Sequence, residues 1–517
     1  MKRSLFKIIA ITFANALAFD ALFAAEPPQV PSPGTGVHDW PQHGRTIYRN
    51  MVSDEKGLPD SFDIGDEQTQ TPPKNIKWVA PLGSRTLGVP IVANGKVYIA
   101  SNAREDNPKY PLEPGAGPVL GALYCFDEKT GTLLWQLCGK RKTGLTLRQY
   151  GLTAAPVVEN NRVYLYGGRL KVLCLTADGL YGQNTGPFVD EKNAFGIQPP
   201  HTLDKTDADV VWAFDNQKNI SNIQCHNAYA YTPLVYGDYV YAATGNGVVS
   251  DEETHHRDHP PRFNADTPSF MVLDKKSGEL VAVDDEKMGR GLIHGSWGTP
   301  CVGMVNGKAQ ILYGGCNGTV YAFDPKPEKP LAEKVGTLKS IWSFDINYYL
   351  KADRPYEVWG APVCDNNRAF FAISDDWMHK KIGGLLVCVD ATKTGDITQT
   401  GKIWEYRDIG ISEGCVSLSK GLLYAADLNG RVHCLDENTG KPYWVYDTKW
   451  EIRANTVVAD GKVYVGNSKG EFFIFKEGKT MELLFHTNMK GEINSPCSIA
   501  NGCLYIAAGK KLYAIKN

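Results

Sequence analysis

The chain has 517 residues, of which 43% are hydrophobic, and its formal net charge of −2 leaves no basic surface for phosphate groups. This balance excludes nucleic acid as an expected partner and disfavours anionic membrane surfaces. The 52 glycines and 30 prolines favour many short strands joined by tight turns, and no segment shows sustained helical periodicity.

The beginning of the chain is organised like a secretory signal. Basic residues precede an apolar run over residues 8–19, and small residues follow around Ala24. The run is too short to span a bilayer comfortably, Asp20 ends it, and no cysteine follows it as a lipoprotein acylation site. We therefore expect a signal peptide over 1–25, a Pro-rich lead segment over 26–75 and no transmembrane span in the mature chain. This predicts a periplasmic or secreted protein.

The remaining residues, 76–517, consist of a repeated unit. The stretch GRVHCLDENTGKPYW, residues 430–444, alternates as a strand does, breaks at Asp-x-x-Thr-Gly and then presents a tryptophan. Related copies lie at residues 121–135, 270–281, 319–325 and 385–396. A second strand signal such as GKVYIA precedes each copy, and eight such signals occur along the chain. A minimum repeat of about 40 residues is the spacing of propeller blades.

Two further strands complete each unit. One is usually opened by a small residue and proline, and the other carries a large side chain at an equivalent position. These positions are Trp135, Trp212, Val283, Trp342, Trp404, Trp444 and Phe485. The last unit lacks its fourth strand, whereas residues 76–83 supply Trp78 without earlier strands. The sequence thus predicts an all-β, eight-bladed β-propeller of four-stranded antiparallel blades, closed by an N-terminal strand that completes the last blade.

The turn inside the repeat explains the order of its residues. Asp436 can accept hydrogen bonds from backbone N–H groups just after it, and Gly440 can take the positive φ that the turn requires. The tryptophan that follows should fill the wedge that widens between neighbouring blades. Loss of one such side chain should cost about 3 to 5 kcal/mol.

The recurring motif, small-Asp-x-x-Thr-Gly-x-x-x-Trp, resembles the pyrroloquinoline quinone (PQQ) repeat. Residues 76–517 are similar to the PQQ-repeat β-propellers of the quinoprotein alcohol dehydrogenase-like superfamily, which are eight-bladed in their full form. The lead from Trp40 to Asp63 also resembles the head of exported planctomycete-type propellers, which mostly lack an assigned activity. The resemblance implies a fold but does not reach a function.

Twelve cysteines in an exported chain would ordinarily favour disulfides. Their phase in the repeat argues against this, because equivalent positions of different blades lie too far apart for sulfur atoms to bridge. Four fall on the third strand, at Cys125, Cys174, Cys388 and Cys434. We expect buried thiols that act as small hydrophobic side chains. A pair within one blade, such as Cys497 with Cys503, stays open, and no spacing of Cys and His indicates a structural zinc site.

Candidate binding residues precede the innermost strands, where side chains project into the mouth of a propeller's central channel. They are Arg85, Arg148, His226, Asn227, His294, Trp297, Glu357, Trp359, Arg453 and Asn455. Together they could stack on a planar ligand and bind its carboxylates or a cation. The alternative is that they satisfy one another around a water-filled channel.

A PQQ-dependent dehydrogenase requires an aromatic floor beneath the quinone, oxygen ligands for Ca²⁺ and a carboxylate base. Trp297 or Trp359 could supply the floor, and Glu357 with Asn227 or Asn455 could bind Ca²⁺. No two cysteines are adjacent, as they are in the vicinal disulfide of many quinoprotein alcohol dehydrogenases, and no catalytic aspartate can be assigned. The cofactor therefore stays unknown, and PQQ with Ca²⁺ is not favoured.

An insertion over residues 250–266 holds His255, His256 and His259 among acidic residues, which are types that suit first-row metals. Two following prolines deny the segment a regular helix, so a solvated loop is the favoured interpretation and no metal site is assigned.

The favoured function is an exported, non-enzymatic propeller that binds an envelope protein or a small-molecule ligand at its channel mouth and blade loops. The alternative is a PQQ- and Ca-dependent quinoprotein dehydrogenase that oxidises an alcohol or sugar. A third hypothesis is a role like that of the outer-membrane assembly lipoprotein of the same fold, and the missing acylation site counts against it.

Overall fold

The structure is a computed structural model that describes most of the chain after the expected signal segment. The described residues are 32–66, 68–104, 107, 109–110, 120–140, 152–167, 170–181, 184, 188–189, 191, 202–220, 223, 232–247, 266–292, 295–328, 334–350, 356–375 and 383–517. None of the helices in this part of the chain has the length and apolarity needed to cross a membrane.

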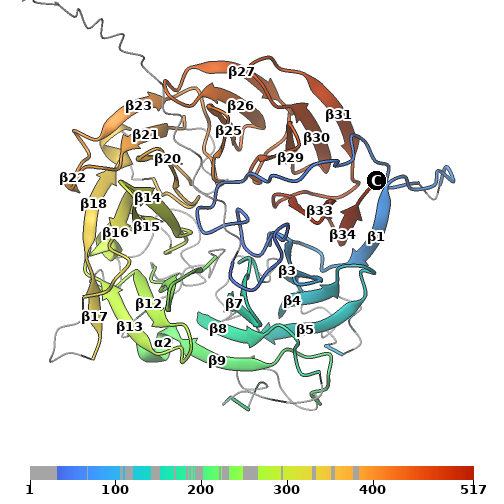
Figure 1. Ribbon diagram of the computed structural model, residues 1–517, viewed down its shortest axis with the longest axis horizontal. Coiled ribbons are helices and arrows are strands. Elements are labelled where there is room, and N and C mark those ends of the chain that lie inside the picture. The colour runs from blue at the N-terminus through green and yellow to red at the C-terminus, as the bar shows by residue number, and fades with distance from the viewer. Residues whose placement is uncertain are drawn as a thin grey trace, which may run out of the picture.

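Eight antiparallel sheets are arranged in a ring around one axis, as the repeat predicts (Figure 1). From the axis outward, blade 1 contains β2 (Ile91–Ala93), β3 (Lys96–Asn102), β4 (Leu120–Asp127) and β5 (Leu133–Lys140). Blade 2 contains β6 (Val157–Glu159), β7 (Arg162–Gly167), β8 (Lys171–Thr176) and β9 (Val210–Asp215), and blade 3 contains β10 (Leu234–Tyr236), β11 (Tyr239–Ala243), β12 (Phe270–Asp274) and β13 (Leu280–Asp284). Blade 4 contains β14 (Cys301–Val305), β15 (Lys308–Gly314), β16 (Thr319–Phe323) and β18 (Ser340–Asp345).

The second half of the ring has the same organisation. Blade 5 contains β19 (Val363–Asp365), β20 (Arg368–Ala372), β21 (Leu386–Asp390) and β23 (Lys402–Tyr406). Blade 6 contains β24 (Ser417–Ser419), β25 (Leu422–Ala426), β26 (Arg431–Asp436) and β27 (Pro442–Asp447), and blade 7 contains β28 (Val457–Ala459), β29 (Lys462–Gly466), β30 (Glu471–Lys476) and β31 (Leu483–Asn488). Blade 8 contains β32 (Ser498–Ala500), β33 (Cys503–Ala508), β34 (Lys511–Ile515) and β1 (Ile76–Pro81). Two short fifth strands, β17 (Gly336–Leu338) and β22 (Gly395–Asp396), extend blades 3 and 4. Short helices α2 (Asn216–Asn219), η1 (Met288–Gly291) and η2 (Ile346–Tyr349) lie in the connections.

The two ends of the propeller meet in blade 8. Strand β1 pairs antiparallel with β34, and Trp78 lies opposite Ala514. The N-terminal strand therefore supplies the outermost strand that the last repeat lacks, which confirms the predicted closure of the ring and removes the open edges between its ends.

Neighbouring blades are joined by tryptophans of the outer strands. The indole of Trp404 in blade 5 packs against the turn of blade 6, and its Nε1 donates to the Glu437 carbonyl over 3.0 Å. Equivalent donations come from Trp78, Trp135, Trp212 and Trp444 to the turns of the blades that follow them. The predicted wedge packing is thus observed for these five tryptophans, each with a backbone partner in the next blade, whereas Nε1 of Trp342 donates to the Gln310 side chain of its own blade.

The turn glycine has a second role that its φ alone does not reveal. Gly440 has a φ of +68°, and a Cβ added there would lie 2.5 Å from Cε3 of Trp404. The Asp436 carboxylate accepts from the N–H groups of Asn438 and Thr439, which sets the turn as expected. The motif therefore combines a turn with a flat, side-chain-free seat for the indole of the preceding blade.

The third-strand cysteines fill the opposite side of the same tryptophans. Cys434 is the cross-strand partner of both Tyr424 and Trp444, so a small side chain separates two large rings. Cys125, Cys174 and Cys388 occupy the same position, and Ala322 and Ala514 replace it in other blades. The eleven described cysteines are buried and free, including Cys497 and Cys503, which confirms the prediction of unbridged thiols for these residues.

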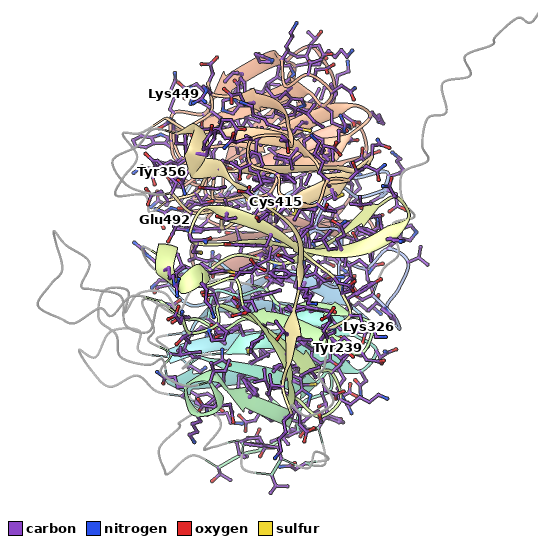
Figure 2. All side chains as sticks on the ribbon, turned by 90° about the vertical axis from the view of Figure 1, so that its left-hand side faces the viewer. Tyr239, Lys326, Tyr356, Cys415, Lys449 and Glu492 are labelled. Atoms are coloured by element: carbon purple, nitrogen blue, oxygen red, sulfur yellow. The ribbon has the colours of Figure 1, made fainter. Side chains whose placement is uncertain are left out.

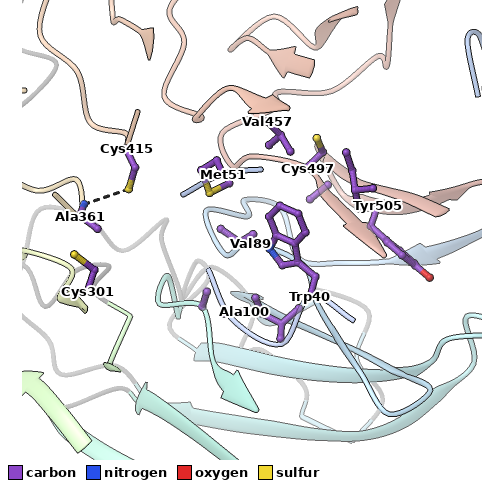
Figure 3. Close-up of a cluster of buried hydrophobic side chains, with 14 of the residues drawn as sticks. Trp40, Met51, Val89, Ala100, Cys301, Ala361, Cys415, Val457, Cys497 and Tyr505 are labelled. Atoms are coloured by element: carbon purple, nitrogen blue, oxygen red, sulfur yellow. Dashed lines mark hydrogen bonds between the residues drawn. The ribbon is translucent and has the colours of Figure 1, made fainter. Parts of the chain in front are cut away.

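The lead segment lies across the axis of the ring (Figure 1). Trp40 and Met51 are fully buried among side chains of the inner strands (Figure 3). Backbone or side-chain hydrogen bonds run from the lead to seven blades, at Val92, Val158, Pro233, Val302, Leu418, Val458 and Asn501. The lead is therefore an integral part of the core, which the sequence did not indicate.

Two titratable side chains of the lead lie on the axis. The fully buried Arg49 donates to the carbonyls of Pro233, Pro300 and His43, and no described carboxylate lies within ion-pair distance of it. Burial lowers the pKa of Arg49 to about 10, so the guanidinium stays charged at neutral pH. Burial and the Arg49 charge lower the pKa of His43 to about 3, which keeps its imidazole neutral.

The lead also completes the wedge between blades 7 and 8. Phe485 replaces tryptophan in β31, and blade 8 has no turn to receive it because the chain ends lie there. Phe62 of the lead packs against Phe485 at a ring-centroid distance of 5.2 Å and against Phe472 at 5.9 Å. An aromatic side chain from outside the repeat thus substitutes for the missing turn.

Replacing Gly440 by alanine should lower the free energy of unfolding by about 3 kcal/mol, because the new methyl group must displace the Trp404 indole. Gly461 is the matched control, since it has a φ of +69° but no atom within 4 Å of an added Cβ. Gly461→Ala should cost only about 1 kcal/mol, from its backbone conformation alone. Urea denaturation of both variants checks this, and equal losses would show that the indole seat contributes nothing.

Acid should weaken the protein through His43. Its pKa is lowered from 6.5 in the unfolded chain, so below that pH the unfolded state binds a proton that the folded state excludes until about pH 3. Stability from this group is therefore complete above pH 6.5 and falls by about 2 kcal/mol between pH 7 and pH 5.

His43→Gln should remove this part of the pH dependence, as measured by urea denaturation at the two pH values. The control is His486→Gln, because His486 is 42% exposed on the outer strand β31. An unchanged pH profile in His43→Gln would contradict the assignment.

Candidate ligand site at the mouth of the ring

Six of the ten candidate residues lie on one face of the disc, which we call the mouth face. Figure 2 shows this face edge-on, with Tyr356, Lys449 and Glu492 on one side of the disc and Tyr239 and Lys326 on the other. The six are Arg85, Trp297, Glu357, Trp359, Arg453 and Asn455, each in a connection that leads into an innermost strand. Arg148, His226, Asn227 and His294 lie outside the described residues, as does the insertion with His255, His256 and His259.

The structure brings three of the candidates into one cluster between blades 4 and 5. The rings of Trp297 and Trp359 lie 5.1 Å apart at 71°, so the edge of one meets the face of the other. Nε1 of Trp359 donates to Oε2 of Glu357 over 2.6 Å. Glu357 is fully buried and Trp297 is 5% exposed. These side chains therefore engage one another, with Trp359 the one that is partly exposed.

Local backbone contacts fix this cluster. Glu357 and Ser374 exchange two backbone hydrogen bonds of 3.1 and 2.7 Å. The Ser374 hydroxyl accepts from the Trp359 N–H and donates to the Ser412 carbonyl, which ties blade 5 to the entry of blade 6. On the other side, the Trp297 N–H donates to Sγ of Cys316, and burial together with the Glu357 charge raises the pKa of that thiol.

A second group forms at the entry to blade 7. The Arg453 guanidinium lies 3.8 Å from a Glu413 oxygen and 3.5 Å from a Glu451 oxygen. Arg453 and Glu413 are each 16% exposed, so this ion-pair group faces the mouth from a partly solvated position. It leaves a polar, net-acidic rim on this side of the mouth face.

Asn455 connects the mouth to the lead segment. Its Nδ2 lies 3.5 Å from Nε2 of His43, and Asn455 is 5% exposed. His43 of the lead contacts Asn455 at the mouth, and Arg49 of the lead donates to the His43 carbonyl. The lead therefore forms the floor beneath the mouth. Sequence reasoning missed His43 and Arg49 because the lead lies outside the repeat and has no periodicity that would assign it to the axis.

Arg85 lies apart from both groups, at the entry to blade 1. Its N–H donates to Oδ1 of Asn102, and its carbonyl accepts from the Ser101 hydroxyl and the Asn102 N–H. The backbone of this entry is thereby fixed, while the half-buried side chain remains on the mouth face.

The described mouth residues are not arranged as the quinone floor and Ca²⁺ ligands for which the sequence offered candidates. A quinone floor needs an open indole face, but Trp297 and Trp359 pack against each other. Glu357 is buried with its carboxylate bound to Trp359, and Asn455 is engaged with His43. Among the residues that the structure describes, no group of three or more His, Cys, Asp or Glu side chains lies close enough to hold a metal ion.

Comparisons with solved structures place the fold among known propellers. BamB from Moraxella catarrhalis covers 86% of this chain and 99% of its own, with a TM-score of 0.51 and 14% identity. A europium-containing methanol dehydrogenase covers 91% of this chain and 89% of its own, with a TM-score of 0.55 and 12% identity. At such identities the likeness extends to the fold alone.

Comparisons of sequence are more specific. The outer membrane protein assembly factor BamB of Nitrosomonas eutropha is 31% identical over 96 residues, which span 18% of this chain and 23% of that protein. A family model described as outer membrane protein assembly factor BamB matches residues 69–326 and 317–516, which is nearly the whole propeller. The chain therefore belongs to this BamB-like family of PQQ-repeat β-propellers.

Proposed function

We propose that this protein is an exported, non-enzymatic propeller that binds a protein of the cell envelope through its mouth face and blade loops. The observation that carries the proposal is the construction of the mouth: its aromatic residues are packed together, and the lead forms its floor. Such a surface suits recognition of a partner's surface rather than enclosure of a small substrate.

Family membership supports a protein as the partner. The family model is described as an outer membrane protein assembly factor, and the curated relative has the same description. A part of the mouth face also has the character of an interaction surface, because Arg453 and its two glutamates are partly solvated and can exchange partners. A small-molecule ligand remains the alternative occupant of the mouth.

The quinoprotein alternative makes a distinct prediction. If the described mouth residues do not hold PQQ, adding PQQ with Ca²⁺ to purified protein should leave the melting temperature unchanged within about 1 °C. After gel filtration the protein should retain no quinone absorbance. A bound quinone together with a clear rise in melting temperature would contradict the proposal and favour a dehydrogenase.

Substitution at the mouth should weaken partner binding. Arg453→Glu places a third carboxylate beside Glu413 and Glu451, and it should lower the recovery of a co-purifying envelope protein by about tenfold. Arg453→Gln should show a smaller loss, and thermal unfolding of both variants should establish that the ring is intact. Lys326→Glu, an exposed substitution on the opposite side of the disc from the mouth, is the control. Equal recovery with all three variants would place the partner elsewhere.

A further inference from the structure

The outer edges of several blades are covered by strands that come from the next blade. Strand β17 pairs in parallel with β13, and β22 pairs in parallel with β18. In blade 1 the outer strand β5 receives a single parallel bridge, from Asp207 to Gln136. In each case the added segment belongs to the connection between the third and fourth strands of the following blade.

The length of that connection decides whether an edge is covered. The covering segments lie in the long connections over residues 177–209, 324–339 and 391–401. The short connections, over residues 128–132, 275–279, 437–441 and 477–482, turn back at once. Within the described residues, nothing pairs with the outer edges of β1, β9, β23, β27 and β31.

Strand β27 differs from the other open edges in its side chains. Tyr443 is 36% exposed and Val445 is 45% exposed, and these two residues flank the buried Trp444. At the two positions that flank the central aromatic residue, open β1, β23 and β31 each present one such side chain, at Val79, Ile403 and Leu484, and Leu483 of β31 is exposed as well. An uncovered edge flanked by apolar side chains is a template for pairing with another chain.

In β27 the residue that follows the tryptophan has the same backbone orientation as its equivalent in the covered strands. Gln136 and Ser343, each the residue after its blade's tryptophan, use outward-facing backbone groups to bond the added segment. Gln136 donates to Thr206 and accepts from Ala208, and the Ser343 carbonyl accepts from Ile397. Val445 follows Trp444 in the same phase, so its N–H and carbonyl face outward from the sheet.

We infer that the outer edge of β27 is a docking site for an extended, apolar segment of another protein, which adds to blade 6 as a parallel fifth strand. The three additions within the chain define the orientation, and Tyr443 and Val445 define the apolar character. Lys479 of blade 7 lies 4.9 Å from the Tyr443 ring and borders the site at one end. This surface is on the circumference of the disc and is separate from the mouth.

The test uses a defined probe, the blocked peptide KTVTVTVTK, with hydrogen exchange and fluorescence anisotropy on the full chain. Binding should slow exchange of the Val445 amide. Val445→Pro removes the outward N–H without touching the inner ladder, and proline is tolerated at a strand edge, so the peptide should bind at least about tenfold more weakly. Val445→Thr keeps the N–H and should lose less.

Val79→Pro is the matched control, because Val79 follows Trp78 in the same phase on the open strand β1. It should bind the peptide as the native protein does, and so should Arg453→Glu, whose substitution lies at the mouth. Absence of protection at Val445 with peptide up to about 1 mM would overturn the inference. Equal peptide binding by Val445→Pro and by the native protein would also overturn it. A dimer of the native protein that Val445→Pro dissociates would overturn it as well, because the occupant of the edge would then be a second copy of this chain.

Discussion

The ring depends on the outer-strand indoles of five blades, each of which donates a hydrogen bond to the turn or connection of the next blade. Trp404 shows the interaction most fully: its Nε1 bonds the Glu437 carbonyl, and its ring covers Gly440. The contact joins residues of consecutive repeats, so it ties together the blades at these junctions, and Trp78 extends the series across the chain ends to Gly131. Because four strands of one blade cannot bury this face alone, the eight units stabilise one another as a closed set.

The lead segment adds a second constraint that acts along the axis. It bonds inner strands of most blades, and it places the charged Arg49 and the neutral His43 beneath the mouth. A guanidinium bound only by carbonyls of the described residues holds the entries of blades 3 and 4 in fixed positions. The mouth is therefore closed from below by the lead segment. Its aromatic residues, Trp297 and Trp359, pack against each other.

The fold was predictable because its signals recur. The Asp-x-x-Thr-Gly turn, the tryptophan position and the cysteine phase each appear in several copies, and Trp78 without preceding strands indicated the closure. The role of Gly440 against the indole could not be read from one sequence, since a positive φ alone accounts for a turn glycine. The lead was not assigned to the axis, because Trp40, His43 and Arg49 occur once and outside the repeat.

The candidate site was predictable only in its location. The repeat phase placed Trp297, Glu357 and Trp359 at the mouth and left open whether they meet, because their mutual packing depends on side-chain rotamers and on Ser374, which no pattern reveals. Four of the candidates lie outside the described residues, so their part in the mouth stays a prediction. The open edge of β27 likewise follows from the length of a connection in the next blade rather than from its own sequence.

Closure of the ring through blade 8 can be measured directly by cross-linking. Pro81 and Lys511 are exposed, directly opposed residues of the antiparallel strands β1 and β34. Opposed residues of such a pair generally lie close enough for a disulfide. In the double variant Pro81→Cys with Lys511→Cys, mild oxidation of the native protein should link the two positions within one chain, and the link should not form in urea. Failure to form this link in the native state, or links only between chains, would contradict a ring closed by its two ends.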